Sequence, residues 1–363
     1  MERLNHHVVL ELARRAHLEV VGPPGCGAWM PDGAVVRETG SSGLGRFLLR
    51  AAWNAFGAAL SRPLDFAFAG SGLVAPIVLI AARMRRARCV VYLHGLDIVV
   101  PHPVYRRVWL PLIRRFDLCL TNSRNTAELA LRAGVPAERI SVLHPGVEPA
   151  PESSPDPAAA WRSHHGLNGR KVLLSVGRLT RRKGLLEFVE RALPGIVAAD
   201  PRAVLVVIGD EASDALAGRA EGMSDQIRRA ASERGLDAHV MLLGPCHEVE
   251  LNAAYQGADL LVFPVLEVPG DVEGFGMVAL EAAAHGLPTV AFAVGGVPDA
   301  VAPGESGWLV KPGDYVAFAA RTLEALSPAG SVSAQTCRRF AGQFAWSSFG
   351  MRLWDYLGQI QRR

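Results

Sequence analysis

The sequence predicts an α/β protein made of two doubly wound domains, each with a parallel sheet. Apolar segments of strand length alternate with helix-length segments along almost the whole chain, which is the pattern of repeated β–α units. The 363 residues, 50% of them hydrophobic, suffice for two domains with separate cores. A Pro- and Ser-rich segment at residues 149–157 separates the two halves.

In the first half, short apolar runs bounded by loop residues predict five strands. A first helix is expected at Leu4–Ala16, and two later helices at Arg46–Leu60 and Asn125–Ala133. The strands are expected at Leu18–Val21, Asp65–Ala69, Cys89–His94, Leu118–Thr121 and Ile140–Leu143.

In the second half, the same criteria predict six strands and a last helix at Trp346–Ile360, where apolar residues recur at helical spacing. The strands are expected at Lys171–Val176, Ala203–Ile208, Val240–Leu243, Asp259–Phe263, Pro288–Phe292 and Gly307–Val310. These elements predict a first domain at 1–148, a linker at 149–170, a second domain at 171–345 and a C-terminal helix at 346–363.

Composition argues against several classes of protein. The five cysteines are odd in number and scattered, which indicates a reducing compartment and no zinc site. The opening residues, Met1 to His7, are polar where a signal peptide needs apolar residues. The apolar run Leu73–Ala82 is too short to span a bilayer. We therefore expect a cytoplasmic protein.

A glycine-punctuated loop that leads into a helix, at residues 273–288, is the most informative motif. Gly274 and Gly276 carry no Cβ, so a ligand can approach the backbone closely. The first N–H groups of the helix lack internal partners and lie at the positive end of its dipole, which favours a bound phosphate. Glu281, inside the helix, could accept hydrogen bonds from the diol of a nucleotide. The alternative is a buried loop–helix joint without a ligand.

A second motif lies upstream, where residues 172–177 predict a buried strand that Arg178 and Lys183 follow. Open α/β sheets bind ligands at the carboxyl ends of their strands. These two cations could therefore neutralise a diphosphate, Arg as a fork and Lys as a point charge. A basic loop after a strand, taken alone, is more often only solvated.

Together the two motifs resemble those of glycosyltransferase family 4, whose members are retaining enzymes with the GT-B fold. The resemblance covers nearly the whole second half and, more weakly, much of the first. It implies two Rossmann-like domains that face each other across a cleft, with the last helix crossing back to the first domain. The residues that carry it are Gly177-Arg178 and Lys183, the pair Glu273 and Glu281, Gly286-Leu287-Pro288, and Gly295-Gly296-Val297-Pro298-Asp299.

The start of the chain departs from the family pattern. Relatives have a strand and a Gly-rich loop before the helix expected at Leu4–Ala16, and we expect both to be missing here. A start codon assigned downstream of the true one would explain this difference. Gly43-Leu44-Gly45-Arg46 lacks the third Gly of a dinucleotide fingerprint, so we expect it only to cap its helix.

The resemblance also implies roles for individual residues. It puts His94 beside the transferred sugar, although a His bonded to loop backbone is the alternative. Glu273 would orient the sugar ring, and the two cations would stabilise the leaving diphosphate. The predicted catalytic residues are His94, Glu273, Arg178 and Lys183, and the predicted donor-binding residues are Gly177, Phe275, Gly276, Met277 and Glu281.

The implied reaction moves a hexose-type sugar from a UDP- or GDP-sugar to a glycan or lipid-linked acceptor, in bacterial surface polysaccharide biosynthesis. We expect no cofactor beyond this co-substrate, and no metal, since no Asp-x-Asp motif occurs. A glycogen-synthase-like or sucrose-type transferase is the near alternative. A catalytically impaired GT-B protein that acts as a binding or scaffolding subunit is an alternative from another class. A nicotinamide dehydrogenase is disfavoured, since no strand precedes a Gly-x-Gly-x-x-Gly motif.

Charge is distributed unevenly between the halves. Residues 1–150 hold 18 Arg, no Lys and 11 acidic residues, a balance of +7, whereas the whole chain has +3. Much of this charge lies at residues 83–88 and Arg106–Arg115, the latter mixed with Trp, Leu and Ile at helical spacing. Such a segment can lie on an anionic membrane at the inner face of the plasma membrane. An ordinary surface helix is the alternative, and no nucleic-acid module occurs.

Overall fold

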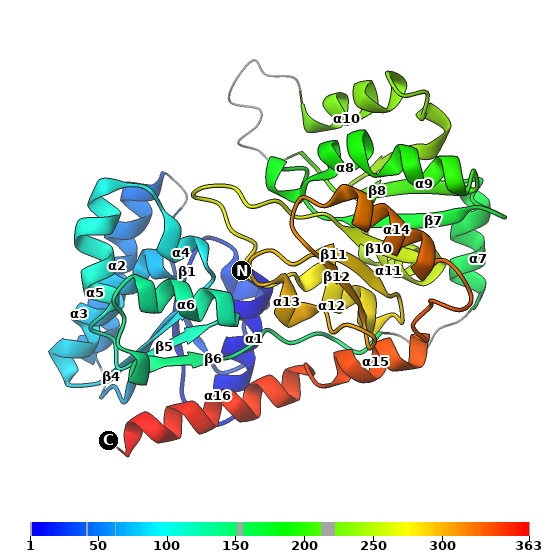
Figure 1. The fold of residues 1–363 in the computed structure, drawn as a ribbon. Coiled ribbons are helices and arrows are strands. Elements are labelled where there is room, and N and C mark those ends of the chain that lie inside the picture. Colours follow the sequence, from blue (N-terminus) through cyan, green and yellow to red (C-terminus); the bar gives the residue numbers. More distant parts are fainter. Residues whose placement is uncertain (1, 41–42, 62, 151–154, 212–221, 363) are drawn as a thin grey trace. The chain divides into compact units, whose positions relative to one another are not determined.

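The computed structural model describes residues 2–40, 43–61, 63–150, 155–211 and 222–362 (Figure 1). The chain divides into two compact units. The first consists of Met1–Gly146 together with Trp346–Arg363, and the second of Val147–Ala345. No helix in the described ranges is long and apolar enough to cross a membrane.

The first unit contains two parallel sheets. The larger has the strand order β3-β4-β5-β6, and β1 and β2 pair separately with each other. Among the described residues, no strand joins β1 to β3. The strands are β1 Glu19–Gly22, β2 Val35–Glu38, β3 Phe66–Ala69, β4 Arg88–Leu93, β5 Leu118–Thr121 and β6 Ile140–Val142.

The helices of the first unit come from both ends of the chain. They are α1 Glu2–Ala13, α2 Leu44–Ser61, α3 Ala75–Arg85, α4 Leu96–Val99, α5 Leu110–Ile113, α6 Arg124–Arg132 and α16 Trp346–Gln361. Short turns are η1 Cys26–Trp29, η2 Gly72–Val74, the π-helical turn η3 Tyr105–Trp109, and η4 Ala137–Arg139.

Alternate residues of β4 build two cores on the two faces of the larger sheet. Cys89, Val91 and Leu93 pack with buried residues of α3, α5 and α6. Val90 and Tyr92 pack with α1 and α16 on the opposite face. This alternation follows from the strand period of two, and it leaves the larger sheet covered by helices on both sides.

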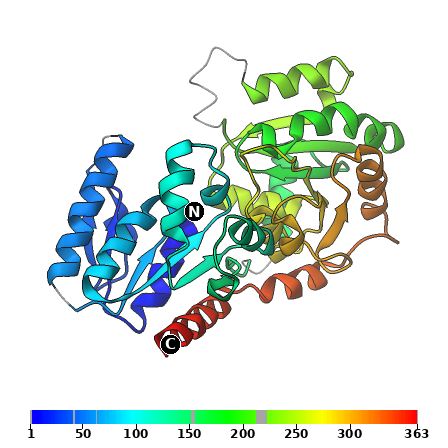
Figure 2. The ribbon, with the colours of Figure 1, turned by 60° about the vertical axis from the view of Figure 1, so that its left-hand side comes forward.

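The C-terminal helix α16 therefore belongs to the first unit. It packs beside α1 (Figures 1 and 2), and its Leu353 is fully buried. Trp354 Nε1 donates to the carbonyl oxygen of Glu11 at 3.1 Å. Tyr356 donates from its hydroxyl to the carbonyl oxygen of Val142, also at 3.1 Å.

The second unit contains one six-stranded parallel sheet in the order β12-β11-β10-β7-β8-β9. The chain begins in the middle at β7, moves outward through β8 and β9, and returns to the other side of β7 with β10. The direction thus reverses between β7 and β10, and ligands of open α/β sheets bind at such a point. The strands are β7 Lys171–Val176, β8 Ala203–Ile208, β9 Val240–Gly244, β10 Leu260–Phe263, β11 Thr289–Phe292 and β12 Gly307–Val310.

Helices follow most strands of the second unit and share one large apolar core with the sheet. They are α7 Pro155–His164, α8 Leu185–Arg191, α9 Leu193–Ala199, α10 Met223–Ser232, α11 Glu248–Gly257, α12 Met277–Ala284, α13 Val297–Ala300, α14 Tyr315–Ala325 and α15 Ala334–Gly342, with short turns η5 Arg181–Lys183 and η7 Asp237–His239.

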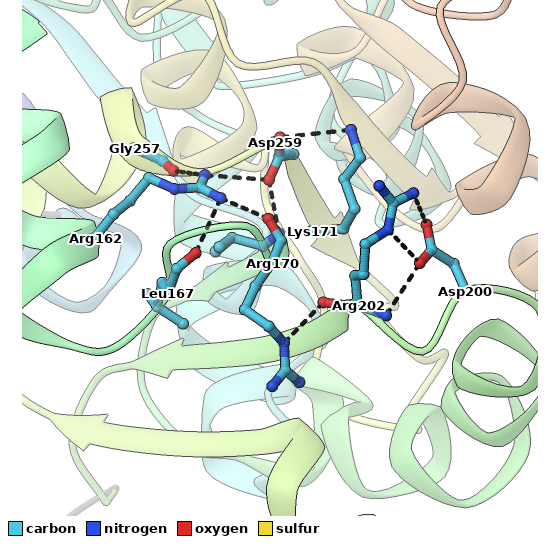
Figure 3. A network of polar contacts seen from close by, with 9 residues as sticks. Arg162, Leu167, Arg170, Lys171, Asp200, Arg202, Gly257 and Asp259 are labelled. Carbon is cyan, nitrogen blue, oxygen red and sulfur yellow. Dashed lines mark hydrogen bonds and ion pairs between the residues drawn. The ribbon is translucent and has the colours of Figure 1, made fainter.

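Polar contacts attach α7 to the edge where β7 and β10 begin (Figure 3). Arg162 of α7 donates to the carbonyl oxygen of Gly257 at 2.7 Å and to Asp259 Oδ2 at 3.3 Å. The same carboxylate oxygen accepts the N–H of Val172, near the start of β7, at 2.7 Å. One carboxylate thus joins a helix to two neighbouring strands.

The predicted linker at 149–170 is wrong for most of its length. Residues 155–164 form α7, and Trp161 and Leu167 lie in the core of the second unit. Proline is tolerated in the first turn of a helix because its missing N–H has no partner there anyway. The Pro-rich composition therefore did not prevent a helix. Residues 151–154 of the predicted linker lie outside the described part of the chain.

All eleven predicted strands are present. β5, β7, β8 and β12 have the predicted bounds, and the others are shifted by one residue at one or both ends. Strand β2 was not predicted, because only Val35 and Val36 of its residues are apolar, and Arg37 and Glu38 follow them.

The contact between α1 and α16 predicts pH-dependent stability. His7 stacks on Trp346 with ring centroids 3.6 Å apart. Burial, with His6 and Arg3 nearby, lowers the pKa of His7 from 6.5 to about 4. Between these values the unfolded chain binds a proton that the folded chain does not, so stability falls as the pH drops below 6.5.

We therefore predict that the urea-unfolding midpoint of the wild type falls more between about pH 7.5 and about pH 5.5 than that of His7→Gln. The matched control is His17→Gln, since His17 is exposed, and it should behave as the wild type. Equal pH dependence in all three proteins would contradict the assignment.

Candidate functional site

The candidate site lies at the carboxyl ends of β7 and β10, on both sides of the point where the strand order reverses. Gly177 and Arg178 follow β7, and the short turn η5 with Arg182 and Lys183 comes next. The loop after β10 carries Glu273 and leads into α12. The two sequence motifs thus follow adjacent strands.

A buried carboxylate lies at the centre of this site. Glu273 Oε2 accepts from Lys183 Nζ at 2.9 Å and from Arg182 Nη1, and its side chain is 13% exposed. Arg182 Nε also donates to Asp271 Oδ1 at 2.9 Å. Lys183 Nζ lies 4.7 Å from the centroid of the Phe263 ring, at the end of β10.

The two cations determine the charge state of Glu273. Burial by itself raises the pKa of this carboxyl, but the Lys183 ammonium and the Arg182 guanidinium outweigh burial and leave the pKa below its usual value. Glu273 is therefore a carboxylate at neutral pH. It can accept hydrogen bonds from a ligand's hydroxyls but cannot donate one.

Arg182 is the residue that the sequence analysis missed. Its side chain is 10% exposed and bonded to two carboxylates, whereas the neighbouring Arg181 is exposed. The three basic residues Arg181, Arg182 and Lys183 read as one basic run in the sequence. The only indication in the sequence that one of them belongs to the site was their position after a buried strand.

Backbone contacts fix the loop that carries Glu273. Its carbonyl oxygen accepts the N–H of Gly296 at 2.8 Å. A Cβ at Gly296 would lie 2.1 Å from the carbonyl oxygen of Gly274, so no other residue fits there without a backbone shift. The motif at 295–299 therefore supports the loop after β10 from the neighbouring strand β11.

The start of α12 has the geometry expected of an anion site. Gly276 is its N-cap with φ 102°, in the region that favours glycine. No side chain of this residue can cap the helix, so the first N–H groups of α12 have no partner from the N-cap. Phe275 is buried, and Met277 is partly exposed.

Glu281 lies on α12 and is held by a neighbouring helix. Its Oε2 accepts from the Tyr255 hydroxyl at 3.1 Å. Tyr255 in turn stacks on His285 with centroids 5.0 Å apart. The carboxylate is partly exposed, so its orientation is fixed while part of it stays open to solvent.

The structure separates the two predicted cations. Lys183 is paired with Glu273 and lies near Gly177, since a Cβ there would be 3.5 Å from Lys183 Cε. Arg178 is exposed. Lys183 is thus already part of the buried charge cluster, and Arg178 lies at its surface.

His94 belongs to the first unit, where it follows β4. Its ring Nε2 lies 2.9 Å from the carbonyl oxygen of Gly70. Asp97 accepts the N–H groups of His94 at 2.8 Å and of Gly72 at 3.1 Å. Burial lowers the pKa of His94 and raises that of Asp97. The ring is thus bonded to loop backbone, and its role beside a sugar stays a prediction.

Among the residues that the structure describes, no group of three or more His, Cys, Asp or Glu is placed to hold a metal ion. The expectation that no metal is needed therefore stays a prediction, based on Arg178 and Lys183 and on the missing Asp-x-Asp motif.

Comparisons with known proteins agree with this architecture. The chain matches the family model of glycosyl transferases group 1 over residues 158–340 and that of Glycosyltransferase Family 4 over residues 1–150. It is 30% identical over 298 residues to a GDP-mannose-dependent alpha-(1-6)-phosphatidylinositol monomannoside mannosyltransferase of Mycolicibacterium smegmatis, covering 79% of this chain and 75% of that protein.

A second curated relative is D-inositol 3-phosphate glycosyltransferase of Mycobacterium tuberculosis. It is 32% identical over 283 residues, which are 72% of this chain and 55% of the relative. The chain thus spans only about half the length of that relative.

Two solved structures match nearly the whole chain. Anabaena HepE, in complex with UDP and glucose, has a TM-score of 0.78 at 19% identity and covers 98% of this chain and 95% of its own. A glycosyltransferase from Rickettsia africae has a TM-score of 0.80 at 16% identity and covers 99% and 94%. At these identities the likeness shows the fold alone. It confirms the prediction of a GT-B fold with two Rossmann-like domains.

The buried charge cluster predicts a loss of stability when Arg182 is removed. Without Arg182, Lys183 is the remaining cation of the cluster beside the carboxylates Glu273 and Asp271. One negative charge is then uncompensated, so Arg182→Met should lower the free energy of unfolding by about 3 kcal/mol. Adding Glu273→Gln removes that charge and should restore part of the loss. Urea unfolding measures both variants.

The matched control is Arg181→Met, which changes an exposed neighbour and should stay within roughly 0.5 kcal/mol of the wild type. If Arg182→Met were as stable as this control, Arg182 would not hold Glu273.

Proposed function

Because the chain belongs to glycosyltransferase family 4, we propose that it is a retaining enzyme that transfers a hexose-type sugar from a UDP- or GDP-sugar. The observation that carries the proposal is the Lys183–Glu273 ion pair at 2.9 Å, next to the loop that leads into α12. The donors named for its relatives support the choice of nucleotide, since one is GDP-mannose-dependent and HepE was solved with UDP-glucose.

The site offers a separate group for each part of such a donor. The N–H groups of Phe275, Gly276 and Met277, at the start of α12, would bind the diphosphate. Glu281, already held by Tyr255 at 3.1 Å, would bind the ribose hydroxyls. The base would lie near residues 244–250, after β9.

Departure of the diphosphate needs positive charge, and two side chains would supply it. Lys183 has three donors, so it can keep its bond to Glu273 while it binds a phosphate oxygen. Arg178 is exposed at the same strand end and would add a fork of two donors. Preorganised cations of this kind stabilise charge that develops in the transition state.

Glu273 would orient the sugar through its hydroxyls. The sequence offers no obvious nucleophile on the enzyme, and retention then favours attack from the face that the diphosphate leaves. In that reaction the bond from the anomeric carbon to the phosphate oxygen breaks, and the acceptor oxygen bonds to the same carbon. The departing phosphate accepts the acceptor's proton. His94, by the family resemblance, would lie beside the transferred sugar.

The acceptor we propose is a lipid-linked or glycan hydroxyl in bacterial surface polysaccharide biosynthesis, reached from the cytoplasm at the inner face of the plasma membrane. Support comes from the +7 balance of residues 1–150 and from the phosphatidylinositol acceptor in the name of one relative. A soluble acceptor is the alternative, which the name of the inositol-phosphate relative favours.

A catalytically impaired binding or scaffolding subunit is the second candidate. The ion-paired Glu273, Lys183 and Arg182 speak against it, because buried charges of this kind are not needed for a scaffold. A thermal-shift screen with UDP-, GDP- and ADP-sugars tests both candidates. A bound donor at roughly 100 times its dissociation constant adds about 2.7 kcal/mol of stability. No shift with any donor would contradict the transferase proposal.

We predict that Lys183→Ala and Arg178→Ala each lower turnover by roughly 10²-fold or more, as expected when a donor to developing charge is lost. Initial rates of sugar transfer measure the effect. Arg181→Ala, an exposed neighbour on the same turn, is the matched control and should keep its rate. Near-normal rates in both site variants would exclude the diphosphate assignment.

A further prediction concerns metal ions. Because Arg178 and Lys183 can supply the positive charge, transfer should continue in excess EDTA at close to its initial rate. Complete loss of activity on chelation, restored by Mg²⁺ or Mn²⁺, would show that a metal ion is required.

A further inference from the structure

We propose that three helices of the first unit form a docking surface for an anionic lipid bilayer, with α2 as the helix that enters the headgroup region. This proposal deepens the proposed function and rests on it, because it assumes the lipid-linked acceptor proposed above. We call the outer sides of α2, α3 and the η3–α5 segment the α2–α3–α5 surface.

The stripe on α2 is the main observation. Its largest side chains point outward, with Trp53 81%, Leu49 74% and Leu60 65% exposed. These positions are spaced by four and seven residues, so they lie on one face of the helix. The side toward the protein carries small residues instead, with Ala51 and Ala59 buried. The helix therefore presents its apolar bulk to the outside.

Exposed apolar residues also occur on the neighbouring helices. α3 packs against both α2 and α5, and the three helices lie together in Figure 1. On α3, Ile80 is 49% and Met84 46% exposed. Val104 and Val108, at η3, are 51% and 45% exposed. Apolar groups thus occur on all three elements.

Basic residues dominate the charge of the surface. No Asp or Glu occurs in α2, α3, η3 or α5. From residue 39 to residue 116 the acidic residues are Asp65 and Asp97. Asp97 is buried, whereas Asp65 is exposed and lines a pocket with Met84 and Arg85 at the end of α3. Exposed arginines accompany the apolar groups at positions 46, 50, 106 and 107. A predominantly basic face is complementary to anionic headgroups.

The combination of groups favours lipid over other anionic partners. Exposed Trp and Leu beside Arg on one helix face is typical of helices that lie in a membrane interface. Nucleic acid would use the arginines but would not need the Leu49–Trp53–Leu60 stripe. A large exposed apolar patch on a soluble protein marks a binding site.

The structure also distinguishes between the arginines of the segment Arg106–Arg115 by the bonds that they make within the protein. Arg114 Nε donates to the carbonyl oxygen of Ala133 at 2.6 Å, which ties this side chain to the protein. At Arg115 the backbone carbonyl oxygen, rather than the side chain, takes part in such a bond, as the acceptor from Arg83 at 3.2 Å, and the residue is exposed. All four arginines of this segment are exposed, and Arg106 and Arg107 lie between the exposed Val104 and Val108.

The test is co-sedimentation of the full chain with vesicles of phosphatidylglycerol and phosphatidylcholine. The wild type should bind at low salt and release as salt rises, because screening weakens the arginine contacts. Leu49→Ala with Trp53→Ala should need at least about tenfold more lipid for half-binding, since two large apolar groups no longer enter the interface. Tryptophan emission should shift to the blue on binding, and Trp53→Phe should lose most of that shift.

The matched control is Val249→Ala with Val316→Ala, which changes two residues of the second unit that are 81% and 82% exposed. It should bind vesicles as the wild type does. The proposal would be overturned if the α2 double variant bound vesicles as well as the wild type does. It would also be overturned if DNA, at the same concentration of negative charge as the lipid, displaced the protein from vesicles. No binding of the wild type at low salt would overturn it too.

Donor binding is measured on the same samples. The α2 double variant should keep any thermal shift with a nucleotide sugar, because α2 belongs to the first unit and the donor groups to the second. If no donor shifts any of the proteins but vesicle binding follows α2, the transferase proposal fails and the docking proposal stands.

Discussion

Strand β7 pairs with β8 on one side and with β10 on the other, and the candidate site depends on this position. Because parallel strands all end at one edge, the residues after β7 and after β10 meet, although many residues separate them in the chain. Lys183 and Glu273 come together in this way, at 2.9 Å. Arg162 and Asp259 hold the opposite edge, so the same two strands are fixed at both ends.

The second unit has a cluster of buried ion pairs, whereas the first unit has a helix with exposed arginines. The second unit buries Arg182, Lys183 and Glu273 in direct contact, where water and salt screen little of their attraction. The first unit leaves Arg46 and Arg50 at its surface, on a helix without acidic residues. Ionic strength should therefore act mainly on the contacts of the first unit with its surroundings and leave the internal geometry of the second unit unchanged.

The sequence predicted more of the second unit than of the first, for physical reasons. The strand runs and the residues Lys183 and Glu273 were visible because buried parallel strands are continuous apolar runs. Arg182 was not distinguished from Arg181, since only the turn of the chain decides which of two adjacent arginines faces inward. In the sequence, α2 has the pattern of an ordinary amphipathic helix, whose apolar face is expected to be buried. The sequence does not show that Ala51 and Ala59, rather than Trp53, face the protein.

The glycine contacts at the carboxyl edge of the sheet limit which positions around this site can be substituted. A Cβ at Gly296 would lie 2.1 Å from the carbonyl oxygen of Gly274, and one at Gly209 would lie 2.0 Å from that of Gly177. These are contacts with backbone atoms, so no rotamer change relieves them. A new donor preference would therefore have to arise by exchange of side chains on other loops, such as residues 244–250, where we propose that the base binds. A library built to alter the sugar nucleotide should vary that loop and keep these glycines.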